Sequence, residues 1–235
     1  YYLYDRKAKK LTFLFDARPE LAKYKLASMK PVVIKARDGL ELVSYLTLPV
    51  GVEPKKLPTV LVVHGGPWAR DSWGFNPEAQ WLANRGFAVL EVNYRGSTGF
   101  GKKFLHAGDR EWGKKMHDDL IDAVAWVIKE GHADPKKVGI MGGSYGGYAA
   151  LAGATFTPDS FACAISIVGP SNLVPLLKSI PPYWEPLKVL FTVRVGDLGD
   201  EEFLKSRSPL FSAGKIKIPM LIAQGANDPR VKQAE

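Results

Sequence analysis

The sequence is poor in cysteine and has no long apolar run. Its single cysteine, Cys163, has no partner for a disulfide within the chain and lies in an apolar stretch, so we expect a small buried core side chain. No apolar run reaches the roughly 18 residues of a membrane-spanning helix. The chain starts with neither methionine nor a basic and then apolar signal segment. We therefore expect a cytoplasmic protein without membrane contacts, whose chain begins inside a larger protein or after processing.

Metal-ligand clusters, dinucleotide-binding fingerprints and long basic tracts are also missing. The formal net charge is +8, but the lysines and arginines are scattered and do not alternate with aromatic residues. We therefore expect no nucleic-acid partner, no metal and no cofactor, and leave a homo-oligomer open. The composition, 46% hydrophobic and 24% charged, is that of an ordinary globular protein.

The order of the predicted elements indicates a doubly wound, mostly parallel sheet. Residues 1–15 predict a hairpin, 16–31 a linker and 32–48 a second hairpin. Beyond Pro58, buried strands alternate with helices, as in doubly wound sheets. Residues 171–209 have a weak period and many prolines, which favours a cap or a pocket-forming insertion. The predicted strands are 60–63, 87–92, 137–141, 161–168 and 219–224, and the predicted helices are 78–85, 118–129 and 148–154.

This organisation predicts two parts of very different size. Residues 1–30 would be an N-terminal hairpin and linker. Residues 31–235 would form one α/β domain, incomplete at its C-terminal side. A length of 235 residues suits one large domain with a small appendage.

The most informative stretch is Gly142-Gly143-Ser144-Tyr145-Gly146, which fits the pattern G-x-S-x-G. A glycine-rich turn can match this pattern by chance. Here a short apolar strand precedes the turn and a helix of small residues follows it. Strand, tight turn and helix are what a nucleophile elbow requires, because the serine must be exposed on a sharp bend. We therefore predict Ser144 as a nucleophile on an α/β-hydrolase fold.

A second glycine-rich turn, His64-Gly65-Gly66-Pro67, directly follows the first parallel strand. A loop of this kind can direct a backbone N–H at the oxyanion that develops when the serine attacks a carbonyl. The second donor would be the N–H of the residue after the nucleophile. We predict Gly66 N and Tyr145 N as the oxyanion hole; the alternative is an ordinary turn between a strand and a helix.

Asp228 lies just beyond the last predicted strand, where a catalytic carboxylate would follow the serine in chain order. Its alternative role is that of a turn residue in an Asn-Asp-Pro sequence. No histidine follows Asp228, and the four histidines, His64, His106, His117 and His132, all precede Ser144. Without a base, the Ser144 hydroxyl would be a weak nucleophile.

Taken together, these stretches resemble the prolyl oligopeptidase family of serine peptidases. Within that family the likeness is to acylaminoacyl-peptidases and to bacterial members similar to dipeptidyl-peptidases. The matching stretches are His64–Pro67, Asn93–Gly101, Trp112-Gly113 with Asp118-Asp119, Gly142–Tyr148 and Asp228–Val231. They follow one another in the expected order from residue 59 to 231.

The resemblance implies Ser144 as nucleophile, Asp228 as triad acid and a histidine beyond the residues given. It also implies that Arg230 holds a backbone carbonyl of a short peptide or acyl-peptide substrate through a charge-assisted hydrogen bond. The first hairpin would be the end of a β-propeller. Most of that propeller and the histidine are missing from the sequence, which departs from the family at both ends.

The substrate pocket should be apolar, with Tyr145, Tyr148, Val168, Trp184 and Val231 as candidates for its wall or for plain core. Of these, Tyr148 and Val231 join Arg230 as predicted substrate-binding residues.

Three hypotheses remain. The first is a serine peptidase that forms an acyl-enzyme on Ser144. The second is a carboxylesterase that uses the same site. The third is a catalytically inactive hydrolase domain or fragment that acts as a binding module, because no histidine follows Asp228.

Overall fold

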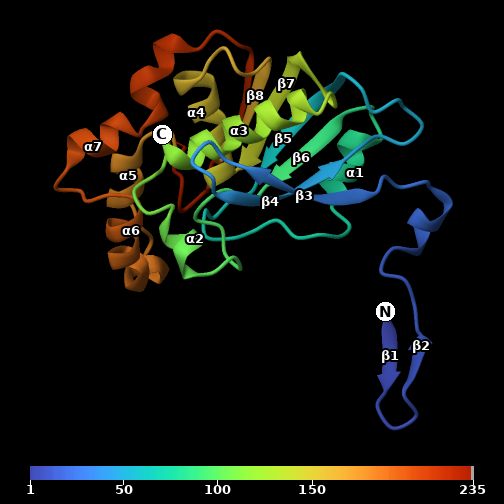
Figure 1. Cartoon of the computed structure of the whole chain (residues 1–235). Coiled ribbons are helices and arrows are strands. Elements are labelled where there is room, and N and C mark those ends of the chain that lie inside the picture. The colour runs from blue at the N-terminus through green and yellow to red at the C-terminus, as the bar shows by residue number, and fades with distance from the viewer. Residues whose placement is uncertain (234–235) are drawn as a thin grey trace.

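The computed structural model describes residues 1–233 and contains two sheets (Figure 1). The small sheet pairs β1 (Tyr2–Asp5) with β2 (Lys10–Phe13). The large sheet has seven strands: β3 (Met29–Lys35), β4 (Glu41–Thr47), β5 (Leu57–Val63), β6 (Ala88–Val92), β7 (Ala133–Gly143), β8 (Cys163–Ile167) and β9 (Met220–Ala223).

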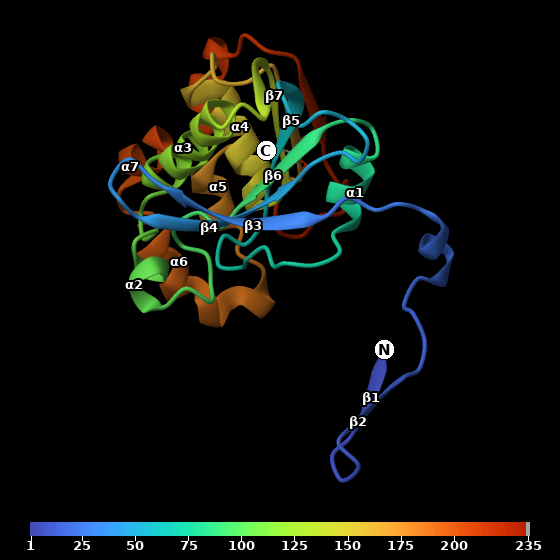
Figure 2. The same ribbon diagram turned by 45° about the vertical axis from the view of Figure 1, so that its right-hand side comes forward.

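The N-terminal hairpin stands away from the large sheet in both views (Figures 1 and 2). Its strands are antiparallel, with Tyr2 opposite Phe13, and the side chains of both strands are exposed. The linker that follows contains one short turn of helix, η1 (Pro19–Lys23). The predicted hairpin is confirmed.

The large sheet has the strand order β3-β4-β6-β5-β7-β8-β9. The pairs β3–β4 and β4–β6 are antiparallel, and every later pair is parallel. The prediction of a mostly parallel, doubly wound sheet is therefore confirmed. Because parallel strands end at the same edge, the residues that follow β5, β7 and β9 lie along one edge of the sheet.

Helices cover both faces of this sheet. On one face, α3 (Lys115–Lys129) and α4 (Tyr145–Phe156) pack on the main core, to which the sheet contributes Leu61 and Ile140. On the other face, α1 (Pro77–Ala83) packs on Val62 and Met141. This division follows from the alternation of side chains along each strand. None of the helices within residues 1–233 has the length and apolar character that crossing a membrane requires.

The weakly periodic stretch after β8 is richer in helix than predicted. It forms α5 (Leu173–Lys178), η2 (Pro182–Leu187), α6 (Lys188–Arg194), α7 (Glu201–Ser206) and η3 (Pro209–Lys215). The sequence analysis also missed α2 (Lys102–His106). These helices are one or two turns long and, apart from α5, bury at most one residue each, so they lack the long apolar stripe by which a helix is identified in sequence.

The prediction of a buried cysteine is wrong, because Cys163 is exposed. Along β8 the side chains alternate, so Ala164 faces the main core while Cys163 faces the side that carries α1. Helix α1 packs on β4 and β6, and the apolar cluster that it forms on this face includes Ile165 of β8 but not Cys163.

Candidate active site

Ser144 occupies the sharp turn between β7 and α4. Its backbone has φ +58° and ψ −118°, a region that residues with a side chain rarely adopt. The turn is held because the Ser144 N–H donates to Ile167 O on β8, at 2.9 Å. The side chain is partly exposed, and its hydroxyl forms no hydrogen bond with the residues that the structure describes.

Two glycines permit this turn by leaving space where a side chain would collide with β5. A Cβ atom on Gly142 would lie 2.4 Å from Val63 O, and one on Gly146 would lie 2.0 Å from the same oxygen. Real Cβ atoms do not approach backbone oxygens so closely. Both positions therefore require glycine.

The loop that follows β5 lies directly against this turn. A Cβ atom on Gly65 would be 3.0 Å from Gly143 O and 3.4 Å from the Ser144 Cβ. Gly66 has φ +120°, a backbone conformation that residues with a Cβ atom rarely adopt and that therefore favours glycine. The N–H groups of Gly66 and Tyr145 donate to no acceptor within residues 1–233, so both remain free to donate.

The His64 side chain holds the peptide group that carries the Gly66 N–H. Its Nδ1 atom lies 2.8 Å from Gly65 O, and a carbonyl oxygen only accepts, so Nδ1 carries the proton. The Ser97 hydroxyl lies 3.0 Å from Nε2 and donates to Tyr94 O at 2.7 Å. Because a peptide group is planar and trans, fixing the Gly65 carbonyl fixes the direction of the Gly66 N–H.

Tyr94 encloses the imidazole of His64. Their rings stack with centroids 4.4 Å apart, and the Tyr94 hydroxyl donates to the His64 carbonyl oxygen at 2.8 Å. This burial lowers the pKa of His64 from its usual 6.5 to about 4. The ring is therefore neutral at pH 7, as an imidazole with a single N–H requires.

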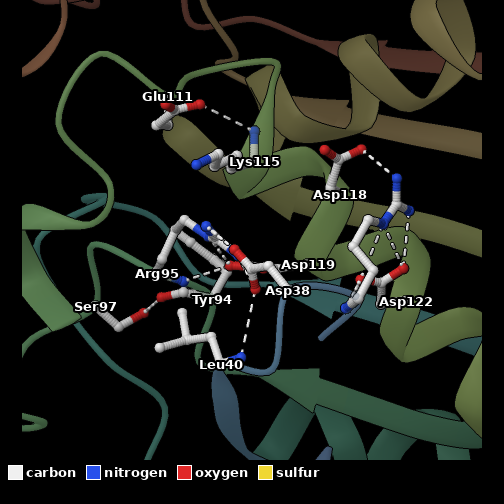
Figure 3. A network of polar contacts seen from close by, with 11 residues as sticks. Asp38, Leu40, Tyr94, Arg95, Ser97, Glu111, Lys115, Asp118, Asp119 and Asp122 are labelled. Atoms are coloured by element: carbon white, nitrogen blue, oxygen red, sulfur yellow. Dashed lines mark hydrogen bonds and ion pairs between the residues drawn. The ribbon is translucent and has the colours of Figure 1, made fainter. Parts of the chain in front are cut away.

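The loop that carries Tyr94 and Ser97 is anchored by a buried ion pair (Figure 3). The Arg95 guanidinium donates to both carboxylate oxygens of Asp119 on α3, at 2.7 and 2.9 Å, and the Arg95 N–H donates to the same carboxylate at 2.8 Å. A second carboxylate, that of Asp38 in the turn between β3 and β4, accepts from the outer edge of the guanidinium at 2.9 Å. Arg95 therefore connects this loop to α3 and to the turn between β3 and β4.

A neighbouring arginine, Arg37, forms a more exposed counterpart of this pair. It donates to Asp122 and to Asp118 one turn earlier on α3. Its side chain is 53% exposed, against 4% for Arg95. The two arginines provide a matched comparison between an exposed and a buried ion pair.

Asp228 follows β9, and its carboxylate orientation is set by the backbone. Oδ1 accepts from the N–H groups of Arg230 and Val231, at 2.8 and 3.1 Å. This geometry is that of a turn residue, and it leaves Oδ2 without a hydrogen bond from the described residues. Ser144 and Asp228 both follow carboxyl ends of strands, with β8 between them, a strand separation of about 10 Å.

The three predicted substrate-binding residues have different surroundings. The Arg230 guanidinium is about half exposed and lies over the Trp184 ring, 5.7 Å from its centroid. Val231 packs into the main core. Tyr148 is buried against Trp112, and its hydroxyl donates to Arg207 O at 2.7 Å, which favours a core role for that side chain.

The other three histidines have partners of their own. His106 contacts Asp109, His117 contacts the Thr157 hydroxyl and His132 contacts Pro54 O. Within residues 1–233, no histidine forms a hydrogen bond with Ser144 or Asp228. The part of the chain that the structure describes also holds no group of three or more side chains suited to bind a metal ion.

Sequence reasoning quoted the stretch around Tyr94 only as a motif and missed its role. The positions that act together, Asp38, Arg95 and Asp119, are far apart in the chain. No local pattern signals such a contact, because it forms only when the turn, the loop and the helix meet.

Comparison with known proteins places these features among peptidases. Residues 73–235 match the model of the prolyl oligopeptidase family. The whole chain is 57% identical to part of dipeptidyl aminopeptidase BIII of Pseudoxanthomonas mexicana and 47% identical to part of dipeptidyl peptidase family member 6 of Caenorhabditis elegans. It spans 36% and 35% of the lengths of these relatives.

Solved structures agree with this comparison. The acylaminoacyl peptidase of Pyrococcus horikoshii superposes on 99% of this chain with a TM-score of 0.86 and 28% identity, over 37% of its own length. The similarity extends over the sheet and its helices, so the arrangement is an α/β-hydrolase fold.

Proposed function

The chain belongs to the prolyl oligopeptidase family, and from this premise we propose that it carries the catalytic machinery of a serine peptidase that cleaves short peptides. Substrates of the acylaminoacyl or dipeptidyl type are the finer part of this proposal. They are suggested by relatives named dipeptidyl aminopeptidase and acylaminoacyl peptidase.

One observation carries the proposal, namely the contact between the Ser144 turn and the loop at Gly66. It brings a partly exposed serine together with two backbone N–H groups, those of Gly66 and Tyr145, that have no acceptor in the described chain. Such donors stabilise the negative oxygen of a tetrahedral intermediate and contribute about 3–4 kcal/mol each in serine hydrolases.

The proposed reaction has two stages. In the first, Ser144 Oγ attacks the scissile carbonyl, the carbonyl oxygen becomes negative beside the N–H groups of Gly66 and Tyr145, and the amine product leaves with a proton. In the second, water attacks the acyl group on Ser144 and releases the acid product.

A base must take the Ser144 proton in the first stage. The four histidines of the sequence precede Ser144, and each contacts another partner within the described residues. We therefore propose that the base is a histidine outside these 235 residues, oriented by the Asp228 carboxylate. The free Oδ2 of Asp228 supports this role.

Arg230 is the proposed contact for the substrate backbone. Its guanidinium is partly exposed, and it lies two residues beyond Asp228, at the same edge of the sheet as Ser144. A guanidinium donates strong hydrogen bonds to a carbonyl oxygen, so it would hold a peptide in register for attack.

The proposal is tested with Ser144→Ala in the natural protein, using alanyl-alanyl and N-acetyl-alanyl p-nitroanilides as substrates. We expect kcat/KM to fall at least about 1,000-fold, because the nucleophile is removed. Ser160→Ala, a partly exposed serine in the turn before β8, is the matched control and should change kcat/KM less than about twofold. Retained turnover by Ser144→Ala would overturn the proposal.

The carboxylesterase and the inactive domain are separated by two further measurements. A p-nitrophenyl ester cleaved far faster than both anilides would favour an esterase. If the wild-type protein cleaves neither and its Ser144 is not labelled by a fluorophosphonate, the inactive binding module is the correct hypothesis, since an unactivated serine reacts poorly.

A further inference from the structure

A cavity of about 500 Å³ lies between the N-terminal linker and helix α1. Its walls come from linker residues 18–27, the loop at 49–52 and the segment 75–86 that contains α1. In both views the linker leaves β3 at the right-hand end of the sheet, where α1 also lies (Figures 1 and 2). The volume is within the range of pockets that hold small molecules, about 300–1,000 Å³.

The walls of this cavity are held together by specific hydrogen bonds. The side-chain amide of Gln80 on α1 accepts from the Ala27 N–H at 2.9 Å and donates to Ala27 O at 2.8 Å. Just outside, the Trp73 indole donates to Met29 O at 3.0 Å. These contacts attach the linker to the domain, so the cavity exists before any ligand arrives.

The lining presents apolar side chains to solvent. Six large apolar residues line the cavity with 40–59% of their surface exposed: Tyr24, Leu26, Val50, Val52, Phe75 and Trp81. Contiguous exposed apolar surface in a concave site indicates binding, because water is readily displaced from it.

All charged side chains that line the cavity are positive. Arg18, Lys25 and Arg85 line the cavity, and no aspartate or glutamate does. The Arg18 guanidinium lies over the Phe75 ring at 5.1 Å and the Arg85 guanidinium over the Trp81 ring at 4.5 Å. None of the three cations forms an ion pair with a carboxylate of residues 1–233. The cavity therefore combines aromatic surface with unpaired positive charge.

This cavity is distinct from the candidate active site. Loop 49–52 and Gly86 precede the amino ends of β5 and β6, whereas Ser144 follows the carboxyl end of β7. Strand β5 has seven residues, so the two ends of the sheet are about 20 Å apart.

We propose that this cavity binds a small organic monoanion with an aromatic or branched apolar body, of the class of N-acylated amino acids. The apolar body would pack on Phe75 and Trp81, and the carboxylate would pair with Arg18 or Arg85. The amine of such a ligand would be acylated and uncharged, because a free ammonium would meet only the positive charges of Arg18, Lys25 and Arg85. The site does not depend on the activity proposed for Ser144.

The test measures binding of N-acetyl-L-tryptophan and of its carboxamide by ligand-observed NMR and calorimetry. The two probes have the same apolar body and differ in charge. We expect the carboxylate to bind at least about tenfold more tightly, a difference of about 1.4 kcal/mol. Equal affinity of the two probes would overturn the proposal.

Variants locate the binding. Arg18→Gln/Arg85→Gln should weaken the carboxylate at least about tenfold, and Arg6→Gln/Lys7→Gln on the exposed hairpin should leave it unchanged. Trp81→Leu, which removes a half-exposed ring and should not disturb the fold, should weaken both probes. Ser144→Ala should retain full affinity. The proposal would be overturned if the carboxylate probe bound the Arg18→Gln/Arg85→Gln variant with unchanged affinity, or if Ser144→Ala no longer bound it, because either result would place the binding site outside this cavity.

Discussion

His64 shows how one side chain can set the direction of a backbone donor. Its imidazole holds the Gly65 carbonyl at 2.8 Å, and the N–H at the opposite edge of that peptide is the one proposed to meet the oxyanion. His64 would then be a positioning residue, because its own atoms would not touch the substrate. From the sequence, its position in the loop favours a shaping role over base catalysis, but the contact with the Gly65 carbonyl could not be predicted.

We predict that His64→Ala lowers kcat about tenfold and leaves KM nearly unchanged. The Gly66 N–H would lose its fixed direction, which costs part of the effect of deleting a donor. Steady-state kinetics on the p-nitroanilides checks this, with His64→Asn as the conservative variant whose amide can donate to Gly65 O. A fall in stability with unchanged kcat would show that His64 has only a structural role.

A second residue-scale effect concerns two carboxyl groups on the α1 side of the sheet, the buried Glu91 and the partly buried Asp71. Burial raises the pKa of each to about 7, from 3.8 and 4.5, and their mutual repulsion adds to the rise for Asp71. The buried oxygens Asp71 Oδ2 and Glu91 Oε2 have no hydrogen-bond partner in the described chain. Between about pH 4 and 7 the folded state therefore keeps protons that the unfolded state releases. The contribution of these two groups to the free energy of unfolding is greatest near pH 4 and is lost as the pH rises through 7.

We predict that Glu91→Gln raises the free energy of unfolding by about 2–3 kcal/mol at pH 8 and gives no gain at pH 4. The amide stays neutral at both pH values and retains an oxygen that can accept from Asn76. Urea denaturation at the two pH values measures the difference. Glu41→Gln, at an exposed position of β4, is the control, and an equal gain from both variants would argue against a buried titrating group.

At the scale of elements, the molecule depends on contacts between segments that are distant in sequence. The loop after β6 supports His64 from behind, and Arg95 joins that loop to α3 and to the turn between β3 and β4. Asp119 is completely buried, so its charge is acceptable only while Arg95 is present.

We predict that Arg95→Met lowers the free energy of unfolding by about 3–5 kcal/mol, because it leaves a buried carboxylate unpaired. Arg37→Met should cost no more than about 1 kcal/mol, since that pair is exposed to solvent. Urea denaturation of both variants under the same conditions compares them. Similar losses would mean that burial does not decide the strength of these ion pairs.

At the scale of the whole molecule, the N-terminal hairpin and the large sheet are separate in energetic terms. The hairpin strands contact each other, and their side chains are exposed along their whole length. The linker is different, because Gln80 and the cavity walls hold it against α1. The boundary between loosely and firmly attached chain therefore lies before residue 18.

We predict that deleting residues 1–15 changes the free energy of unfolding by less than about 0.5 kcal/mol, because no core side chain is removed. Deleting residues 1–27 should cost more, since the hydrogen bonds to Gln80 and the apolar contacts of the linker would be lost. Urea denaturation of the two shortened chains tests this order. A large loss from the shorter deletion would show that the hairpin packs on the domain.

Elements with a strong local pattern could be predicted from the sequence. The buried strand at Val60–Val63, the amphipathic helix that became α3 and the glycine-bounded turn at Ser144 each have a periodicity or spacing that depends on neighbouring residues alone. The family resemblance came from the same stretches, and the family comparison confirms it. The short helices after β8 could not be predicted, because one or two turns carry too few apolar positions to show a period.

The sequence by itself therefore determined which chemical groups follow one another along the chain: a glycine-rich loop, then a serine on a tight turn, then an aspartate. What only the tertiary structure decided is how distant residues meet. The exposure of Cys163 depends on which helices cover β8, the hold of His64 on Gly65 depends on the loop after β6, and the cavity depends on the linker docking on α1. These contacts join residues that share no local pattern, and packing brings them together only in the folded chain.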